Sequence, residues 1–104
     1  MPRPVFQTRT RLVDLAGGLP VLVASADVRR VAIGFASNDS ANADIQIGWS
    51  DRLNTEGFFL VPTSGVEWIT YQNHGDLIFA EYWGLHTKAP SPFVNVIELV
   101  WVDG

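Results

Sequence analysis

Turn-forming residues divide this chain into about eight short apolar runs, and that pattern favours strands over other regular structure. The runs are bounded by Gly, Pro, Asn, Asp or Ser, and they follow one another closely along the 104 residues. No window carries the helically spaced apolar stripe that a core helix needs. The sequence therefore predicts an all-β fold, an antiparallel β-sandwich of about eight strands with jelly-roll-like or Greek-key connections.

The clearest strand is the run from Arg29 to Asn38, in which large and small apolar side chains alternate. Alternate side chains point to opposite faces of a strand, so the large ones are expected in the core. The small ones would let another backbone or sheet approach closely. Further strands are expected over residues 7–13, 20–25, 44–50, 58–62, 66–71, 76–83 and 93–104, and residues 51–57 are expected to form a loop or one helical turn.

The last run, FVNVIELVWVDG, carries apolar side chains on both faces, with Val94 and Val96 on one face and Leu99 and Trp101 on the other. A small sandwich standing alone covers only one face of each sheet. Only 17% of the residues are charged, which also suggests that part of the surface does not face water. A partner subunit is the simplest cover for the second face.

Charge and composition exclude several other classes of protein. The net charge is −4, so the chain as a whole repels phosphate and nucleic acid is not expected as a partner. Most arginines lie in the first thirty residues, which leaves open a local contact with an acidic protein surface. There is no cysteine, and no apolar run reaches the length of a signal peptide or a membrane span. We expect a protein made in the cytoplasm of its host, with no membrane partner.

No catalytic, cofactor or metal motif stands out. His74 and His86 both lie in turn sequences and lack the close spacing on one strand that metal-binding cupins use, so surface turn histidines are the favoured interpretation. A small cupin-like enzyme that binds metal through these two histidines stays as an alternative. Overall we expect no enzyme, no cofactor and no metal.

Three carboxylates interrupt apolar runs, and a buried carboxylate can have a raised pKa and act as an acid in glycoside hydrolysis. Pairing with Arg29 or Arg30 is the favoured interpretation, because charged groups inside apolar strands are usually paired. The three carboxylates are Glu67, Glu81 and Glu98.

Aromatic residues offer a different function. Trp68, Tyr71 and Trp83 could form an exposed platform for a sugar ring, which makes a carbohydrate-binding module the main alternative. Trp68 is nevertheless in register with aliphatic residues expected in the core, which favours packing in the core or at an interface. Tyr82 and Trp83 at a strand end are typical of protein interfaces.

The order of elements from Arg29 onward resembles that of small jelly-roll-like virion structural proteins of tailed phages. The strand RRVAIGFASN is followed by a polar turn and the strand DIQIGWS, then by GFFLVPTSG at residues 57–65, VEWITY and DLIFAEYW. The resemblance implies a capsid decoration or cement protein, or part of a fibre or adaptor, that acts as a trimer or another homo-oligomer. It implies no catalytic residues.

Together these observations predict a virion protein that binds the major capsid protein on the outer capsid surface as a homo-oligomer, most simply a trimer, and stabilises the shell. Pro2 and Pro4 hold the chain extended, so residues 1–12 are expected to form an arm and the first strand, and residues 13–104 the sandwich. The arm is a candidate docking segment, through strand addition or arginine contacts. The expected interface residues are Arg3, Val5, Phe6, Arg9, Arg11, Tyr82, Trp83, Val100 and Trp101.

Overall fold

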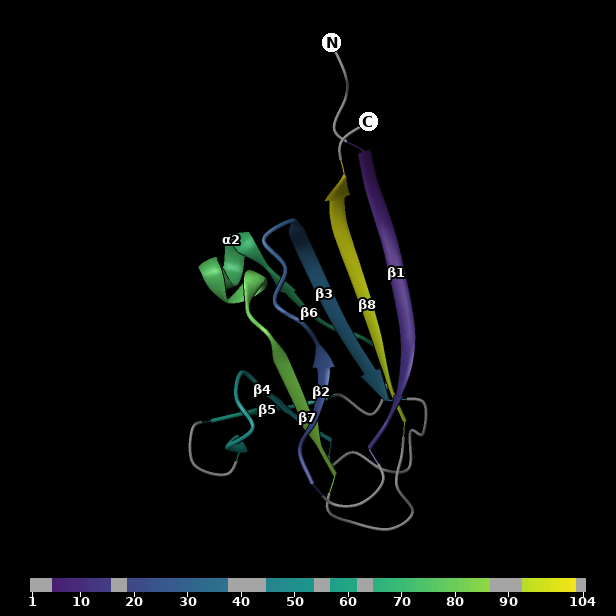
Figure 1. Ribbon diagram of the computed structural model, residues 1–104, viewed down its shortest axis with the longest axis vertical. Coiled ribbons are helices and arrows are strands. Elements are labelled where there is room, and N and C mark those ends of the chain that lie inside the picture. Colours follow the sequence, from purple (N-terminus) through teal and green to yellow (C-terminus); the bar gives the residue numbers. More distant parts are fainter. Residues whose placement is uncertain are drawn as a thin grey trace.

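A computed structural model describes residues 5–15, 19–37, 45–53, 57–61, 65–86 and 93–102, and it confirms the all-β sandwich (Figure 1). Within these ranges eight strands form two antiparallel sheets of four strands each. A short helical segment separates β6 from β7. The elements are β1 (Val5–Asp14), β2 (Val21–Ala24), β3 (Arg30–Ser37), β4 (Gln46–Gly48), β5 (Phe59–Leu60), β6 (Glu67–Thr70), α2 (Tyr71–His74), the 3₁₀ helix η1 (Gly75–Phe79), β7 (Tyr82–Leu85) and β8 (Phe93–Val102).

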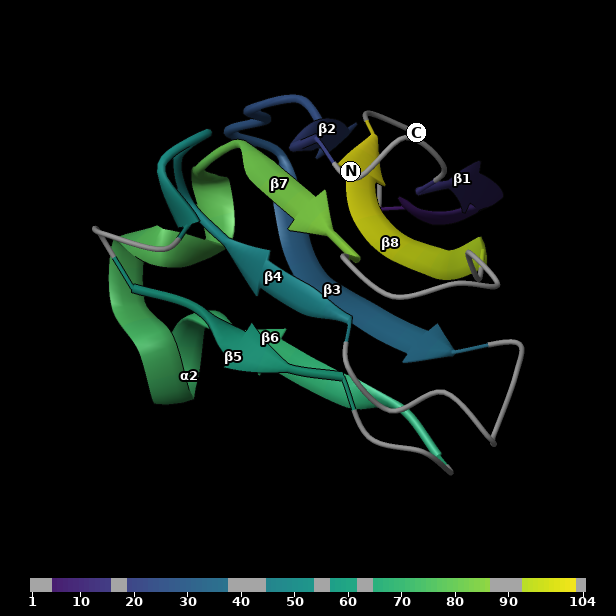
Figure 2. The same cartoon turned by 90° about the horizontal axis from the view of Figure 1, so that it is seen from below.

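The strand order is that of a jelly roll. Sheet A has the order β1-β8-β3-β6, and sheet B has the order β2-β7-β4-β5. The first strand pairs with the last, the second with the seventh, the third with the sixth and the fourth with the fifth, always antiparallel. A long two-stranded ribbon folded over on itself produces this nesting. The strands of both sheets are seen together from below in Figure 2.

The core lies between the two sheets and takes the large side chains that the alternation in residues 29–38 predicts, except Val31, which falls at a bulge and is only partly buried. Ile33 and Phe35 of β3 are fully buried, together with Val94 and Val96 of β8. Sheet B contributes Ile47 from β4. A bulge between Arg30 and Ala32 shifts the pairing of β3 with β8. Because a bulge changes which residues face inward, the Arg30 side chain enters the same interior as the aliphatic residues that follow it.

The prediction of a strand over residues 76–83 is wrong for most of that range. The chain forms α2 and η1 there, and β7 begins only at Tyr82. The hydroxyl of Thr70 accepts a hydrogen bond from the Asn73 N–H at 3.3 Å, which caps the first turn. Gly75 then takes a positive φ of 60°, and the Tyr82 hydroxyl donates to the Leu77 carbonyl at 2.7 Å. These local hydrogen bonds outweigh the short apolar alternation.

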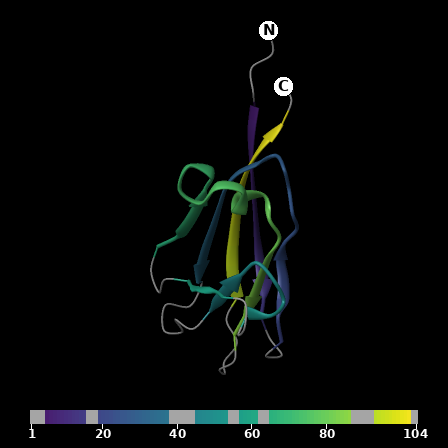
Figure 3. The same cartoon turned by 90° about the vertical axis from the view of Figure 1, so that its left-hand side faces the viewer.

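The amino-terminal boundary also needs correction. Residues Val5 to Asp14 pair with β8 without a break in register, so the boundary expected after residue 12 falls inside β1. Residues 5–12 therefore belong to the sandwich and not to a separate arm, while residues 1–4 lie outside the described part. The start of β1 and the end of β8 project together beyond the other strands at one end of the molecule (Figure 3).

Candidate functional site

The outer face of sheet A carries large apolar side chains on three of its strands. Register places Phe6 of β1 on this face opposite Trp101 of β8, and Leu12 of β1 opposite Asn95. Phe6 is 53% exposed and Leu12 is 52% exposed. Trp68 of β6 lies on the same face, opposite Gly34 of β3. The apolar residues of this face are Phe6, Leu12, Ala32, Gly34, Ala36, Val66, Trp68, Phe93, Ile97, Leu99 and Trp101, and we call this set the apolar face. Thr8, Thr10, Thr70 and Asn95 lie among them.

Gly34 gives the apolar face a flat centre. A Cβ atom at this position would lie 2.7 Å from Val66 Cγ1 and 2.9 Å from the Trp68 ring. The sequence predicted that the small residues of β3 would allow another backbone or sheet to approach closely. At Gly34 the close neighbours are Val66 and Trp68 of the same chain. Trp68, expected to face inward, instead lies on the outside of the sheet.

The apolar face continues into an open apolar pocket of about 450 Å³ at the end where β1 begins and β8 ends. Phe6 and Trp101 belong to both the face and the pocket, and Arg29 provides the charged group beside the aromatic rings. The lining is completed by Val28, Arg30, Val31, Tyr71 and Phe79.

The interior holds a second feature, an ion-pair network centred on Glu98. Glu98 and Arg30 are each 1% exposed. The Arg30 Nε donates to Glu98 Oε2 at 2.8 Å, and Arg11 Nη1 donates to Oε1 at 2.7 Å. Arg9 Nη2 reaches the same carboxylate at 3.3 Å. Three guanidinium groups therefore converge on one buried carboxylate.

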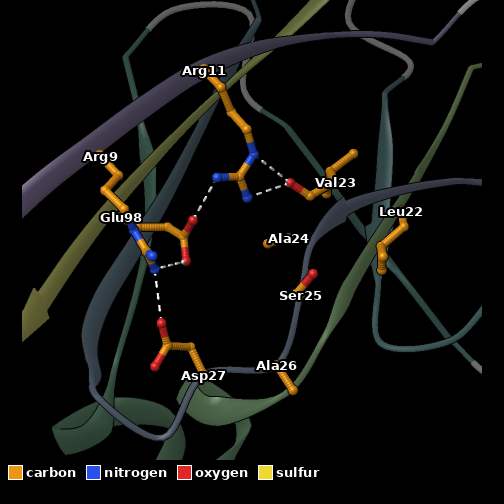
Figure 4. A pocket seen from close by; sticks show the side chains of 9 residues that line it. All are labelled: Arg9, Arg11, Leu22, Val23, Ala24, Ser25, Ala26, Asp27 and Glu98. Atoms are coloured by element: carbon orange, nitrogen blue, oxygen red, sulfur yellow. Dashed lines mark hydrogen bonds and ion pairs between the residues drawn. The ribbon is translucent and has the colours of Figure 1, made fainter.

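The network joins the two sheets along the side where β1 and β2 are their edge strands. Arg11 donates from Nε and Nη2 to the Val23 carbonyl of β2 at 3.0 and 2.6 Å, and Arg9 donates to Asp27 at 2.8 Å (Figure 4). Between these groups lies a cleft of about 250 Å³. We call it the arginine cleft; it is lined by Arg9, Arg11, Leu22, Val23, Ala24, Ser25, Ala26, Asp27 and Glu98.

Arg30 also fixes the backbone beneath the cleft. Its guanidinium donates to the carbonyls of Ser25, Ile78 and Ala80. The loop after β2 and the segment after α2 are thereby attached to the same buried cation. Arg30 lies 5.6 Å from the centre of the buried Tyr82 ring, within the range of a cation–π contact.

The environment of Glu98 favours its charged form. Burial alone would raise the pKa of this carboxyl, but hydrogen bonds from Arg11 and Arg30, together with their charges, outweigh burial and lower it. The expected pairing of Glu98 with Arg30 is confirmed, whereas Arg29 contacts Asp27 at 3.6 Å. A carboxylate held ionised by three arginines is not poised to donate a proton, and Glu67 and Glu81 are exposed on other strands and loops.

The two histidines occupy different environments. His74 is partly exposed, and its Nδ1 accepts from the Thr70 N–H at 3.4 Å. His86 is only 1% exposed, so the prediction that it lies on the surface is wrong. Among the described residues no group of three or more potential metal ligands is found.

The structure places the expected interface residues in several different environments. Phe6 and Trp101 pair across β1 and β8 on the apolar face, while Arg9 and Arg11 line the arginine cleft. Tyr82 and Val100 are buried in the molecule, at 0% and 1% exposed, so the expectation that they contact a partner is corrected: their side chains pack the core. Val5 is exposed near the start of β1, Trp83 is half-buried, and Arg3 lies outside the described residues.

The three-ring platform expected for carbohydrate binding is not formed. Trp68 lies on the outer face of sheet A, whereas Trp83 belongs to sheet B and pairs with Leu22 and Gly48 on the opposite outer face. Tyr71 sits on α2 and contacts Phe79, with ring centres 5.9 Å apart. The two tryptophans therefore cannot present their rings to one ligand.

In the part of the chain that the structure describes, no helix has the length and apolar character to cross a membrane. A scan against protein-family models and searches of curated proteins and solved structures give no match. The argument for function therefore rests on the apolar face and the arginine cleft.

Proposed function

We propose that this chain is a non-enzymatic structural protein that works as a homo-oligomer and that the apolar face is its subunit contact. The observation that carries the proposal is the exposure of Phe6, Leu12, Trp68 and Trp101 on one side of one sheet. Aromatic residues in such a concentration mark the centre of protein interfaces more often than a surface left in water.

The size of the apolar face supports this proposal. Strands as long as β1 and β8 extend about 33 Å, and four strands about 4.8 Å apart give a footprint on the order of 500 Å². Because side chains protrude from the sheet, the accessible area of the face is larger than that footprint and approaches the roughly 800 Å² that each partner buries in a standard interface. The apolar pocket beside Phe6 and Trp101 adds to the area that a second subunit could bury.

We place this oligomer on the outer capsid surface of a tailed phage, bound to the major capsid protein as a decoration or cement protein, with a trimer as the simplest oligomer. The support is the resemblance of residues 29 to 83, together with the jelly-roll strand order. The mechanism would be mass action: a ligand that binds only the assembled shell stabilises it, and the effect is multiplied over many sites.

Size measurement by light scattering tests the subunit contact. Leu12→Glu introduces a charge on the apolar face and is expected to shift the oligomer to monomer. Leu60→Glu is the matched control, because Leu60 is 53% exposed on β5 of sheet B and Leu12 is 52% exposed. A wild-type protein that stays monomeric at high concentration, or equal dissociation by the two variants, would contradict the proposal.

A separate experiment tests the capsid placement. Phage particles assembled without this protein are expected to release their DNA at a lower temperature, and purified wild-type protein is expected to restore the release temperature. Leu12→Glu should restore it less well at equal concentration, because a monomer lacks the combined binding of linked subunits. Particles with unchanged release temperature would remove the capsid from the proposal while leaving the oligomer intact.

A further inference from the structure

The outer edge of β1 is unusually open to another strand. β1 is an end strand of sheet A, and its ten residues pair with β8 without a bulge. No other described strand borders its outer side (Figures 1 and 2). Exposed edges in natural proteins are usually short, bulged, or protected by Lys, Pro or inward-pointing charged residues. β1 is long and contains neither Lys nor Pro, and its inward-pointing charges, Arg9 and Arg11, are paired with Glu98 and Asp27.

The hydrogen-bond pattern identifies which backbone groups face that edge. The Trp101 N–H of β8 donates to the Arg29 carbonyl on the β3 side at 2.8 Å. Backbone groups of successive residues point to opposite sides of a strand, so Val100 and Glu98 face β1. Their partners Gln7 and Arg9 are therefore the hydrogen-bonded residues of β1. The N–H and C=O groups of Phe6, Thr8, Thr10 and Leu12 consequently point to the open edge.

The inner side of this edge is positively charged. Among the described residues, Arg9, Arg11, Arg29 and Arg30 share two carboxylates, Asp27 and Glu98, in a chain whose net charge is −4. The local surplus is therefore two positive charges. Arg9 Nε is buried and has no hydrogen-bond acceptor among the described residues. A carboxylate brought to the mouth of the arginine cleft would supply one.

A second copy of β1 does not match this edge. The middle of β1 lies between Arg9 and Thr10, so the two longest antiparallel pairings of β1 with its own copy centre on one or the other of these residues. The first places Arg9 opposite its own copy, and the second places Arg9 opposite Arg11. Like charges directly opposite each other destabilise strand pairs. The charge pattern therefore selects a strand of different composition.

We propose that β1 accepts an extended acidic segment of a partner protein as an additional strand of sheet A. Thr8 and Thr10 would supply the backbone hydrogen bonds to the added strand. Arg9 and Arg11 would occupy the intervening non-hydrogen-bonded positions, where opposing Cα atoms approach to about 4.5 Å and side chains are closest. The carboxylates of the segment would lie opposite these two arginines, and β-branched residues would lie opposite the two threonines. This docking edge does not depend on the subunit contact proposed for the apolar face.

Synthetic peptides test the proposal without knowledge of the natural partner. The probe is a peptide of about nine residues in which Glu alternates with Val and Thr, long enough to span the β1 edge. The matched peptide has Gln in place of every Glu. Binding is measured by fluorescence anisotropy with a dye at one end of each peptide. The acidic peptide is expected to bind at least tenfold more tightly than the Gln peptide, and less tightly as salt is raised.

Protein variants locate the binding at the edge. Thr10→Pro removes an edge-facing N–H and leaves the hydrogen bonds to β8 in place, because proline is tolerated where the N–H faces solvent. It is expected to weaken binding of the acidic peptide at least tenfold, whereas Thr10→Val, which retains the N–H, is expected to bind like wild type. If Thr10→Pro does not fold, Thr8→Pro takes its place. A peptide N-methylated at its bonded positions provides the same test without altering the protein.

Three results would overturn the proposal. The first is failure of the acidic peptide to bind wild-type protein. The second is equal binding by the Gln peptide, which would remove the role of charge. The third is unchanged binding after both the proline substitution and N-methylation, which would place the peptide elsewhere. None of these results alters the outcome of the light-scattering test of oligomerisation.

Discussion

Replacing Glu98 with Gln tests the ion-pair network directly. Its side chain is 2% exposed and accepts hydrogen bonds from Arg30, Arg11 and Arg9. Glu98→Gln keeps the shape, but it removes the negative charge and turns one acceptor oxygen into an NH₂ donor. That donor faces a guanidinium, which also only donates. Arg30, whose side chain is 0% exposed, then lacks the carboxylate that neutralises it.

The expected loss is large relative to the stability of a small domain. Removing one partner of a buried ion pair costs about 3–5 kcal/mol, because an uncompensated charge stays behind. The carbonyls of Ser25, Ile78 and Ala80 still accept from Arg30, but they carry no net charge. For a domain of this size a loss of about 4 kcal/mol lowers the Tm by roughly 15–30 °C.

Thermal and urea unfolding, followed by circular dichroism, measure this loss. Glu67→Gln is the matched control, since Glu67 is exposed on β6, and it should change the free energy of unfolding by less than about 0.5 kcal/mol. The double variant Arg30→Met with Glu98→Leu removes both buried charges and should be more stable than Glu98→Gln. A Glu98→Gln protein within about 1 kcal/mol of wild type would refute the reasoning, since that cost is typical of a neutral hydrogen bond.

Two further predictions concern pH and packing. Because the folded-state pKa of Glu98 is lowered, its stabilising contribution is present above the unfolded value near 4.5 and is lost as the pH falls through the lower folded value. Urea unfolding from neutral pH down to about pH 3 should therefore show a steeper fall in stability for wild type than for Glu98→Gln, and parallel curves would contradict this. A Cβ atom at Gly48 would meet the Leu53 side chain and lie 2.7 Å from the Gly57 carbonyl oxygen, a backbone atom that cannot easily move. Gly48→Ala should cost about 1–3 kcal/mol in urea unfolding, and a loss of less than about 0.5 kcal/mol would show that the loop adjusts.

The fold was largely predictable because its strands alternate strongly. In β8 buried and less buried residues alternate along most of the strand, and β3 directs Ile33 and Phe35 into the core after its bulge, so the period of two is visible in the sequence. The error at residues 76–81 has a local cause. The Thr70 cap and the positive φ at Gly75 decide that segment, whereas its apolar residues alternate too briefly to impose a strand.

The candidate sites were only partly predictable. Phe6 was identified as part of the expected docking segment at the amino terminus, and Trp101 because the last run is apolar on both faces. The arginine cleft depends on contacts between residues far apart in the sequence, such as Arg11 with Glu98, and no local pattern reports them. The available signal was a single charge in each of two apolar runs, at Arg30 and Glu98, which together suggest a buried pair.

Both outer faces of the sandwich expose apolar side chains, since Leu22 and Leu60 of sheet B are 42% and 53% exposed, but sheet A exposes the larger set. On sheet B, Leu53 and the backbone at Gly57 lie directly over Gly48, so the chain covers part of this face itself. On sheet A no described loop lies over Phe6 or Leu12, which remain half-exposed.

The two proposed contacts also use different parts of sheet A. A subunit on the apolar face meets the side chains of β1, whereas an added strand meets its backbone. Leu12→Glu alters a side chain on the face and retains the edge-facing N–H of residue 12. Thr10→Pro removes one edge N–H and leaves the large apolar side chains in place. Because one contact uses side chains and the other uses backbone groups, we propose that the jelly roll can hold a second subunit and an acidic strand at the same time.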